Sequence, residues 1–213
     1  MYKHILTISL ILFLFNCVKM PPILHYQERL ALLNQELSNW QSFKITGNTE
    51  LQYQAFTIRG QAVLLKTENK FRFDILNQSI FGLGGGVLMA VYVDDEEVQA
   101  RLFGSSAIET FELDSGHGRM ISFLSESLFQ SLYDQREIII ETFEANYDGF
   151  LIQFNSNMQL TRIYNSQQNI GADFEYDRNN NLTELKLLTP ITRNFIIHVD
   201  KIEYENIVVN PLK

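Results

Sequence analysis

The feature that most constrains the fold is a long succession of short apolar segments with the two-residue period of β-strands. Residues 43–53 show it most clearly, because Phe43, Ile45 and Leu51 alternate with polar residues such as Lys44. This alternation is typical of an antiparallel strand with one buried and one solvated face. The strand-like segments do not alternate with helical ones, so the βαβ units of a parallel sheet are not expected.

About ten or eleven segments qualify as strands by this pattern or by apolar run and flanking turns. They are residues 43–53, 55–66, 71–75, 87–93, 98–103, 108–113, 150–154, 159–164, 172–176, 182–188 and 194–199, the last of which could run on through 201–208. The chain is therefore predicted to be mainly β, of the α+β kind, with one large antiparallel sheet, curled or barrel-like, and its helices gathered on one side.

Two segments carry a helical period instead. Tyr26, Leu30, Leu33 and Leu37 predict an amphipathic helix that ends near Trp40. A second helix is expected over residues 120–132, and the region 116–149 around it is the expected lid. The apolar stripe of this second helix includes Met120, Ile121, Leu124, Leu128 and Leu132. Residues 137–147 fit both a buried strand and a further helical turn.

The first residues have the layout of a bacterial export leader. Lys3 precedes an apolar run from Ile5 to Phe15, which is well short of the roughly 20 residues that a membrane-spanning helix requires. Cys17, the only cysteine, follows Asn16 directly after this run. A small hydrophobe at the end of an uncleaved helix is the alternative, but a lipoprotein acylation site explains the position better. We expect a signal peptide over 1–16, a lipidated tether over 17–24 and a single domain over 25–213.

Charge and cysteine content exclude several classes of protein. The formal net charge is −8, and removal of residues 1–16 would take away Lys3 and no acidic residue, which gives −9. This acidic balance argues against binding to nucleic acid phosphates. A single cysteine allows no intramolecular disulfide. Membrane attachment would instead depend on acyl chains at Cys17, each buried methylene contributing about 0.8 kcal/mol.

The sequence contains no recognisable catalytic or metal-binding motif. The four histidines lack metal-ligand spacing to one another or to cysteine. Acidic pairs such as Asp173 and Glu175 are ordinary on the solvated face of a strand, so a carboxylate-based hydrolase is only a nominal alternative. The glycine-rich segment 82–86 lacks the Lys-Ser/Thr ending of a phosphate-binding loop. We therefore expect a protein that is not an enzyme and that uses neither cofactor nor metal.

Residues 77–86 form a glycine-rich loop that carries large apolar side chains. Ile80, Phe81 and Leu83 stand among four glycines, whose conformational freedom suits a turn or a protruding tip. These three side chains either fold back into a core or project and contact an apolar surface.

The apolar content of the flanking strands gives a second pair of alternatives. Several strands are apolar on both faces, so a helix could fill a curled sheet completely, or it could leave a cavity for an alkyl chain. The candidate cavity-lining residues are Phe71, Phe73, Ile75, Val87, Met89, Val91, Met120, Leu124 and Leu128.

The order of these segments resembles that of the LolA/LolB lipoprotein-localisation factors, and of LolB-like outer-membrane lipoproteins in particular. The resemblance rests on Trp40 before Phe43-Lys44-Ile45-Thr46-Gly47, then Phe71-Arg72-Phe73-Asp74-Ile75-Leu76-Asn77, the Phe81-Gly82-Leu83-Gly84 loop, a strand, a charged turn and a helix containing Met-Ile. It extends from about residue 33 to 132 and is looser from 150 onward. Leu14-Phe15-Asn16-Cys17 resembles a lipobox, with Asn16 in place of the usual small residue.

The resemblance implies a half-open antiparallel barrel with helices over its mouth and an apolar cavity that takes acyl chains. It also implies an exposed hydrophobic loop that contacts the membrane, with Phe81 or the neighbouring Leu83 at its tip. The expected function is to accept lipoproteins from a periplasmic carrier protein and help insert them into the outer membrane, with the protein anchored through Cys17 on the periplasmic side. The alternative is a structural or assembly lipoprotein of the same fold, with a filled core and a protein partner.

Overall fold

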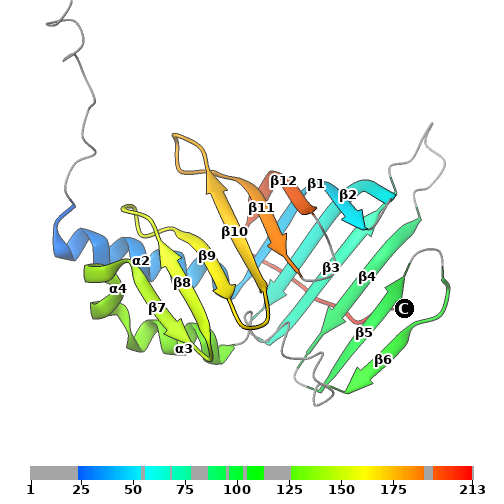
Figure 1. The fold of residues 1–213 in the computed structure, drawn as a ribbon, viewed down its shortest axis with the longest axis horizontal. Helices are drawn as coiled ribbons and strands as arrows, with labels where there is room; N and C mark the ends of the chain where they lie inside the picture. The colour runs from blue at the N-terminus through cyan, green and yellow to red at the C-terminus, as the bar shows by residue number, and fades with distance from the viewer. Residues whose placement is uncertain are drawn as a thin grey trace, which may run out of the picture.

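The computed structural model describes residues 24–53, 56–67, 69–77, 86–94, 96–102, 105–112, 126–189 and 194–212. Within these ranges the chain forms a single antiparallel sheet of twelve strands together with helices at one end (Figure 1). The predicted fold class, a large curled antiparallel sheet with helices, is confirmed. The order of strands across the sheet is β6-β5-β4-β3-β2-β1-β12-β11-β10-β9-β8-β7.

The strands follow the apolar pattern of the sequence closely. Their bounds are β1 Phe43–Tyr53, β2 Phe56–Thr67, β3 Lys70–Leu76, β4 Val87–Val93, β5 Glu97–Leu102, β6 Glu109–Glu112, β7 Glu144–Tyr147, β8 Phe150–Phe154, β9 Leu160–Asn165, β10 Ile170–Tyr176, β11 Leu182–Leu188 and β12 Asn194–Glu203. The twelfth strand, beyond the ten or eleven expected, is β7, which comes from the segment that the sequence left open.

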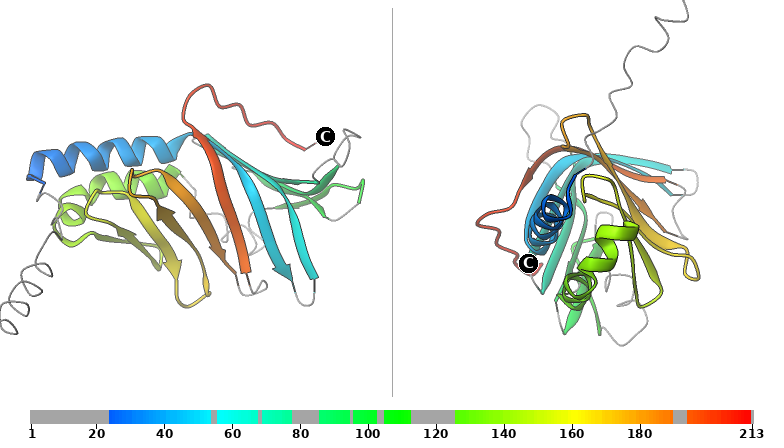
Figure 2. Two further views of the ribbon diagram at one scale, coloured as in Figure 1. Left: turned by 90° about the horizontal axis from the view of Figure 1, so that it is seen from above. Right: turned by 90° about the vertical axis from the view of Figure 1, so that its left-hand side faces the viewer.

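The sheet is unclosed, because its edge strands β6 and β7 are not paired with each other in the described part of the chain. The first and last strands are neighbours at its centre, where Ile45 lies opposite Ile202 and Leu51 opposite Phe195. This pairing joins the N-terminal half, β1 to β6, to the C-terminal half, β7 to β12. The two further views in Figure 2 show how the sheet twists and curls between these halves. Right-handed twist accumulates across many strands and produces such a shape.

Helix α2, Tyr26–Gln41, packs on the inner face of the sheet. Leu33, Leu37 and Trp40 are buried on one stripe, as the helical period predicts, whereas Tyr26 is exposed. The N-terminus is held by a hydrogen bond of 2.8 Å from the backbone N–H of His25 to the Glu28 carboxylate. No helix among the described residues is long and apolar enough to cross a membrane.

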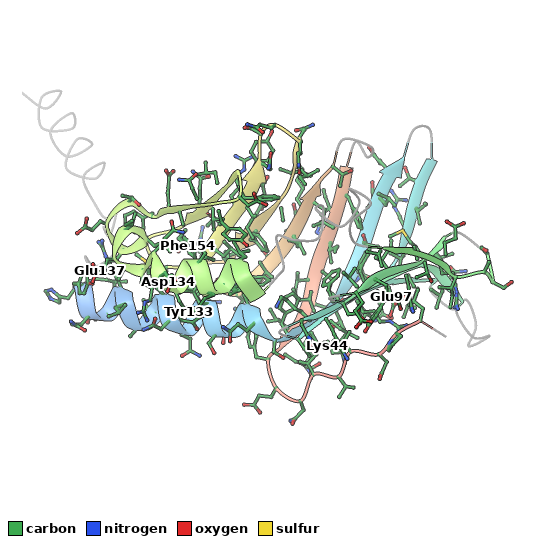
Figure 3. The ribbon with its side chains drawn as sticks, turned by 90° about the horizontal axis from the view of Figure 1, so that it is seen from below. Lys44, Glu97, Tyr133, Asp134, Glu137 and Phe154 are labelled. Carbon is green, nitrogen blue, oxygen red and sulfur yellow. The ribbon has the colours of Figure 1, made fainter. Side chains whose placement is uncertain are left out.

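The predicted lid region is described only from residue 126 onward. There α3, Glu126–Asp134, and α4, Arg136–Thr142, pack beside α2 (Figure 3). Segment 137–147 is thus mostly helical: Ile139 and Ile140 are buried while Ile138 is exposed, and β7 begins directly after the left-handed Phe143 (φ 61°). The described part of the predicted lid therefore contributes side chains such as Leu128 and Ile139 to the main hydrophobic core.

Glycines inside strands mark places where backbones approach closely, as at Gly47 and Gly171. A Cβ at Gly47 would meet the carbonyl oxygen of His198, and one at Gly171 would meet that of Ile163. Gly47 also lies at the register shift between β1 and β12. Such positions exclude any side chain, which explains why glycine interrupts apolar strands here.

The C-terminal segment, residues 204–212, crosses the other face of the sheet over β2–β5 (Figure 1). Val209 and Leu212 pack with Ala90 and Tyr92 in a small core of their own. The Arg72 guanidinium donates hydrogen bonds to the carbonyls of Asn210 and Pro211, at 3.0 and 3.3 Å. The C-terminal segment therefore does not cover the inner face of β3 and β4.

Candidate functional site

An apolar pocket lies on the inner face of the curled sheet and has a volume of about 230 Å³. Side chains from both halves of the sheet surround it, together with the last turn of α2. Its lining consists of Trp40, Phe43, Leu64, Phe71, Phe73, Met89, Val91, Ile170, Gly171, Ala172, Phe174, Leu185, Leu187, Leu188, Thr189 and Phe195. Thr189 contributes the only polar side chain of this set, so the pocket offers almost nothing but van der Waals contact.

Aromatic rings build the wall between helix and sheet. The Trp40 ring packs edge-on against Phe43 and Phe174, with centroid distances of 5.0 and 4.9 Å. Further along the pocket, Phe73 and Phe195 lie 5.5 Å apart. The two Trp40 pairs have the edge-to-face geometry that aromatic rings prefer, and the Phe73–Phe195 pair is tilted.

Four of the predicted cavity-lining residues surround this pocket. Phe71 and Phe73 project from β3, while Met89 and Val91 project from β4. Phe73 and Val91 are directly opposite in the strand pairing, so their side chains share one face of the sheet.

Three other predicted lining residues lie elsewhere. Ile75 and Leu128 are fully buried in the main core. Val87 lies on the opposite face, against the small core that contains Tyr92. The reason is a bulge: Ile75 pairs with Met89 but Leu76 pairs with Val87, so Leu88 is the extra residue of β4. One extra residue reverses the side-chain direction.

The remaining candidate positions lie outside the described residues. They are the acylation site Cys17, the loop residues Ile80, Phe81 and Leu83, and the helix residues Met120 and Leu124. The lipid anchor and the membrane-contacting loop therefore stay predictions from the sequence.

Sequence reasoning missed the half of the pocket that comes from the C-terminal strands. Phe174, Leu185 and Phe195 lie on β10, β11 and β12, and each was recognised only as part of an apolar strand. Their two-residue period was a signal that they face a core. Their meeting with Phe73 around one pocket depends on the β1–β12 pairing and the curl of the sheet.

A second, polar pocket of about 590 Å³ lies beside the C-terminal half of α2. Trp40 lines both pockets. The lining of the polar pocket consists of Glu36, Asn39, Trp40, Gln159, Tyr176, Asn180, Asn181, Leu182, Thr183, Val199, Asp200, Lys201, Ile202 and Tyr204.

The Glu36 carboxylate of the polar pocket is held in place by hydrogen bonds. Its Oε1 accepts hydrogen bonds from Trp40 Nε1 at 2.8 Å, from the backbone N–H of Leu160 at 2.9 Å and from the Tyr176 hydroxyl at 3.3 Å. Burial raises the pKa of Glu36 above its usual 4.5, although these hydrogen bonds act in the opposite direction. Burial and the charge of Glu36 raise the pKa of Tyr204 to about 12. Burial raises the pKa of Tyr176 as well, and so do the charge of Glu36 and the hydrogen bond to Glu36.

Two of the acidic residues near or within strands, Asp94 and Asp173, have structural partners. Asp94 accepts hydrogen bonds from the backbone N–H groups of Glu96 and Glu97 at 2.9 and 3.0 Å, which closes the β4–β5 turn. Asp173 pairs with Arg162 at 3.0 Å. The described residues contain no group of three or more His, Cys, Asp or Glu side chains placed to hold a metal ion.

Comparison with known proteins gives weak structural likeness alone. No family model matches this chain, and no curated protein sequence matches it. It is similar to a DUF1329 family protein from Desulfovibrio piger, with 12% identity, a TM-score of 0.36, and coverage of 88% of this chain and 95% of that one. It is also similar to a protein described as an outer membrane lipoprotein-sorting protein domain from Vibrio parahaemolyticus, with 8% identity, a TM-score of 0.41, and coverage of 85% and 94%.

Proposed function

We propose that this protein is a non-enzymatic carrier that accepts acyl chains in its apolar pocket. The observation that supports the proposal is the pocket itself: about 230 Å³, bounded by both halves of the sheet and lined almost wholly by apolar side chains. Such a lining cannot satisfy the hydrogen bonds of a polar ligand, which would lose those it makes with water. It suits an alkyl chain, which has none to lose.

The capacity of the pocket can be compared with a known case. An engineered cavity of about 150 Å³ lined by Leu, Ile and Phe stays dry and binds benzene, which corresponds to roughly 25 Å³ per carbon atom. At that ratio a pocket of 230 Å³ holds roughly nine carbons. The pocket therefore suits the end of one acyl chain.

The proposed place of this carrier in the cell rests on the leader-like first residues and on the resemblance to LolB-like lipoproteins. In our proposal, acylation at Cys17 anchors the protein to the periplasmic side of the bacterial outer membrane, where it receives acylated proteins from a periplasmic carrier protein and helps insert them. The apolar loop side chains Phe81 and Leu83 would contact the bilayer during transfer. Burying each such side chain contributes roughly 1.5–3 kcal/mol, which favours docking and leaves it reversible.

Native mass spectrometry of protein purified from membranes tests the carrier function, together with titration of a fluorescent acyl probe. We expect co-purified lipid or saturable probe uptake. Val91→Phe, which places a larger ring in the pocket, should weaken uptake. Val63→Phe is the matched control, because Val63 pairs with Asp74 on the opposite face of the sheet. A clean apo mass without probe uptake would instead support a scaffold lipoprotein with a protein partner.

A further inference from the structure

The polar pocket has the composition of a binding site for an organic cation. Three aromatic side chains line it, Trp40, Tyr176 and Tyr204, together with the carboxylate of Glu36. Aromatic faces attract cations through the ring quadrupole, and cages of aromatic rings recognise ammonium groups in proteins. A carboxylate beside such rings adds direct charge attraction.

The two oxygens of the Glu36 carboxylate are not equivalent. All three hydrogen bonds from described residues, those of Trp40, Leu160 and Tyr176, go to Oε1. Oε2 accepts none from the described part of the chain. The carboxylate is thus held in one orientation by three donors while one oxygen stays available to a ligand, a preorganised acceptor.

The charge balance around Glu36 favours a cationic ligand. The other charged side chains of the pocket are Asp200 and Lys201, and Lys201 Nζ is already 2.8 Å from the Glu203 carboxylate. Asp200 accepts a hydrogen bond from the neutral amide of Asn48 at 3.1 Å. An anion would meet the uncompensated charge of Glu36, whereas an ammonium group would neutralise it.

We propose that the polar pocket binds the ammonium group of an amphiphile, with Glu36 Oε2 as the acceptor and the aromatic side chains of Trp40, Tyr176 and Tyr204 in the surrounding lining. The substrate class is then an alkyl chain that bears a primary ammonium headgroup. The alkyl chain would occupy the apolar pocket, which shares Trp40 with the polar pocket. This part rests on the proposed carrier function, whereas the ammonium site in the polar pocket stands on its own.

The test compares decylammonium with decan-1-ol, which have the same chain and differ in headgroup. Trp40 is the only tryptophan of the chain, so its fluorescence reports ligands beside both pockets. We expect decylammonium to bind at least tenfold more tightly than decan-1-ol, and we expect Glu36→Gln to abolish this preference. The glutamine keeps an oxygen for the three donors and puts an NH₂ group where Oε2 was. Glu141→Gln, on the exposed surface of α4, is the control for loss of one negative charge and should leave the preference intact.

The outcomes distinguish failure of the ammonium site from failure of the carrier function. If both ligands bind equally to the wild-type protein, or if Glu36→Gln keeps the preference, the ammonium site is refuted and the carrier function is unaffected. If decan-1-ol does not bind but decylammonium binds and depends on Glu36, the carrier function is refuted and the ammonium site is supported. If neither binds, both are refuted. Tyr204→Leu, at an exposed residue, gives an independent variant, and it should reduce the preference severalfold.

Discussion

The length of chain that the apolar pocket holds can be measured directly with a series of straight-chain alcohols from about five to twelve carbons. Each methylene that enters the pocket contributes about 0.8 kcal/mol, or roughly a fourfold gain in affinity. With room for roughly nine carbons in 230 Å³, the affinity should rise fourfold per carbon and then level off near nine. Carbons beyond that number would remain in water and add little.

Val91→Phe should move this plateau. Phenylalanine carries about four more side-chain carbons than valine, so at roughly 25 Å³ per carbon the pocket loses about 100 Å³ and the plateau falls to near five carbons. For decan-1-ol the loss of four buried methylenes corresponds to about 3 kcal/mol, or roughly 200-fold in affinity. Val63→Phe should behave like the wild-type protein.

The assay is calorimetric titration, supported by the change in Trp40 fluorescence. An affinity that continues to rise fourfold per carbon through twelve carbons in both the wild-type protein and Val91→Phe would refute this reasoning. It would show that the chain binds elsewhere. A plateau that shifts equally in Val91→Phe and Val63→Phe would mean that the substitutions act through stability, which thermal unfolding of both variants checks.

Three further predictions concern stability, pH dependence and delivery. Gly171→Ala should lower the free energy of unfolding by about 1–3 kcal/mol in denaturant titration, because its Cβ would meet the Ile163 backbone, whereas Gly86→Ala, where no atom lies within 4 Å, should change it little. The folded-state pKa of Glu36 is raised, so the wild-type protein should lose stability relative to Glu36→Gln as the pH rises from 4.5 through that pKa. The melting temperature of Glu36→Gln minus that of the wild-type protein should therefore increase with pH, and a constant difference would contradict the shift. Replacing Phe81 and Leu83 together with Glu should leave the melting temperature unchanged but abolish lipoprotein delivery to membranes, and unimpaired delivery would exclude a role for the loop.

Much of the architecture could be predicted from local pattern. The alternation of residues 43–53 and the helical stripe that includes Leu33 and Leu37 each correspond to an element of the structure. Local pattern was insufficient where one apolar run fits both a strand and a helical turn. The segment around Ile138–Ile140 is the example: it forms a helical turn because Ile139 and Ile140 face the core while Ile138 is exposed.

The candidate site could be predicted only in part. Phe71 and Phe73 share a face because side chains alternate along a strand, and this follows from sequence. Val87 departs from that rule because the bulge adds Leu88 to β4, and the segment 87–93, apolar throughout, gives no signal of it. Glu36 looked like one polar residue among others on a helix, since its three donors come from α2, β9 and β10.

The sequence by itself determined the antiparallel β class, the amphipathic helix that covers the sheet and the apolar character of the inner face. These depend on the period of hydrophobic residues, which is local information. Only the tertiary structure decided where the pockets lie. The β1–β12 pairing brings Phe195 near Phe73, and α2 places Trp40 where it lines both the apolar and the polar pocket. Those contacts join residues far apart in the chain, and no local pattern specifies them.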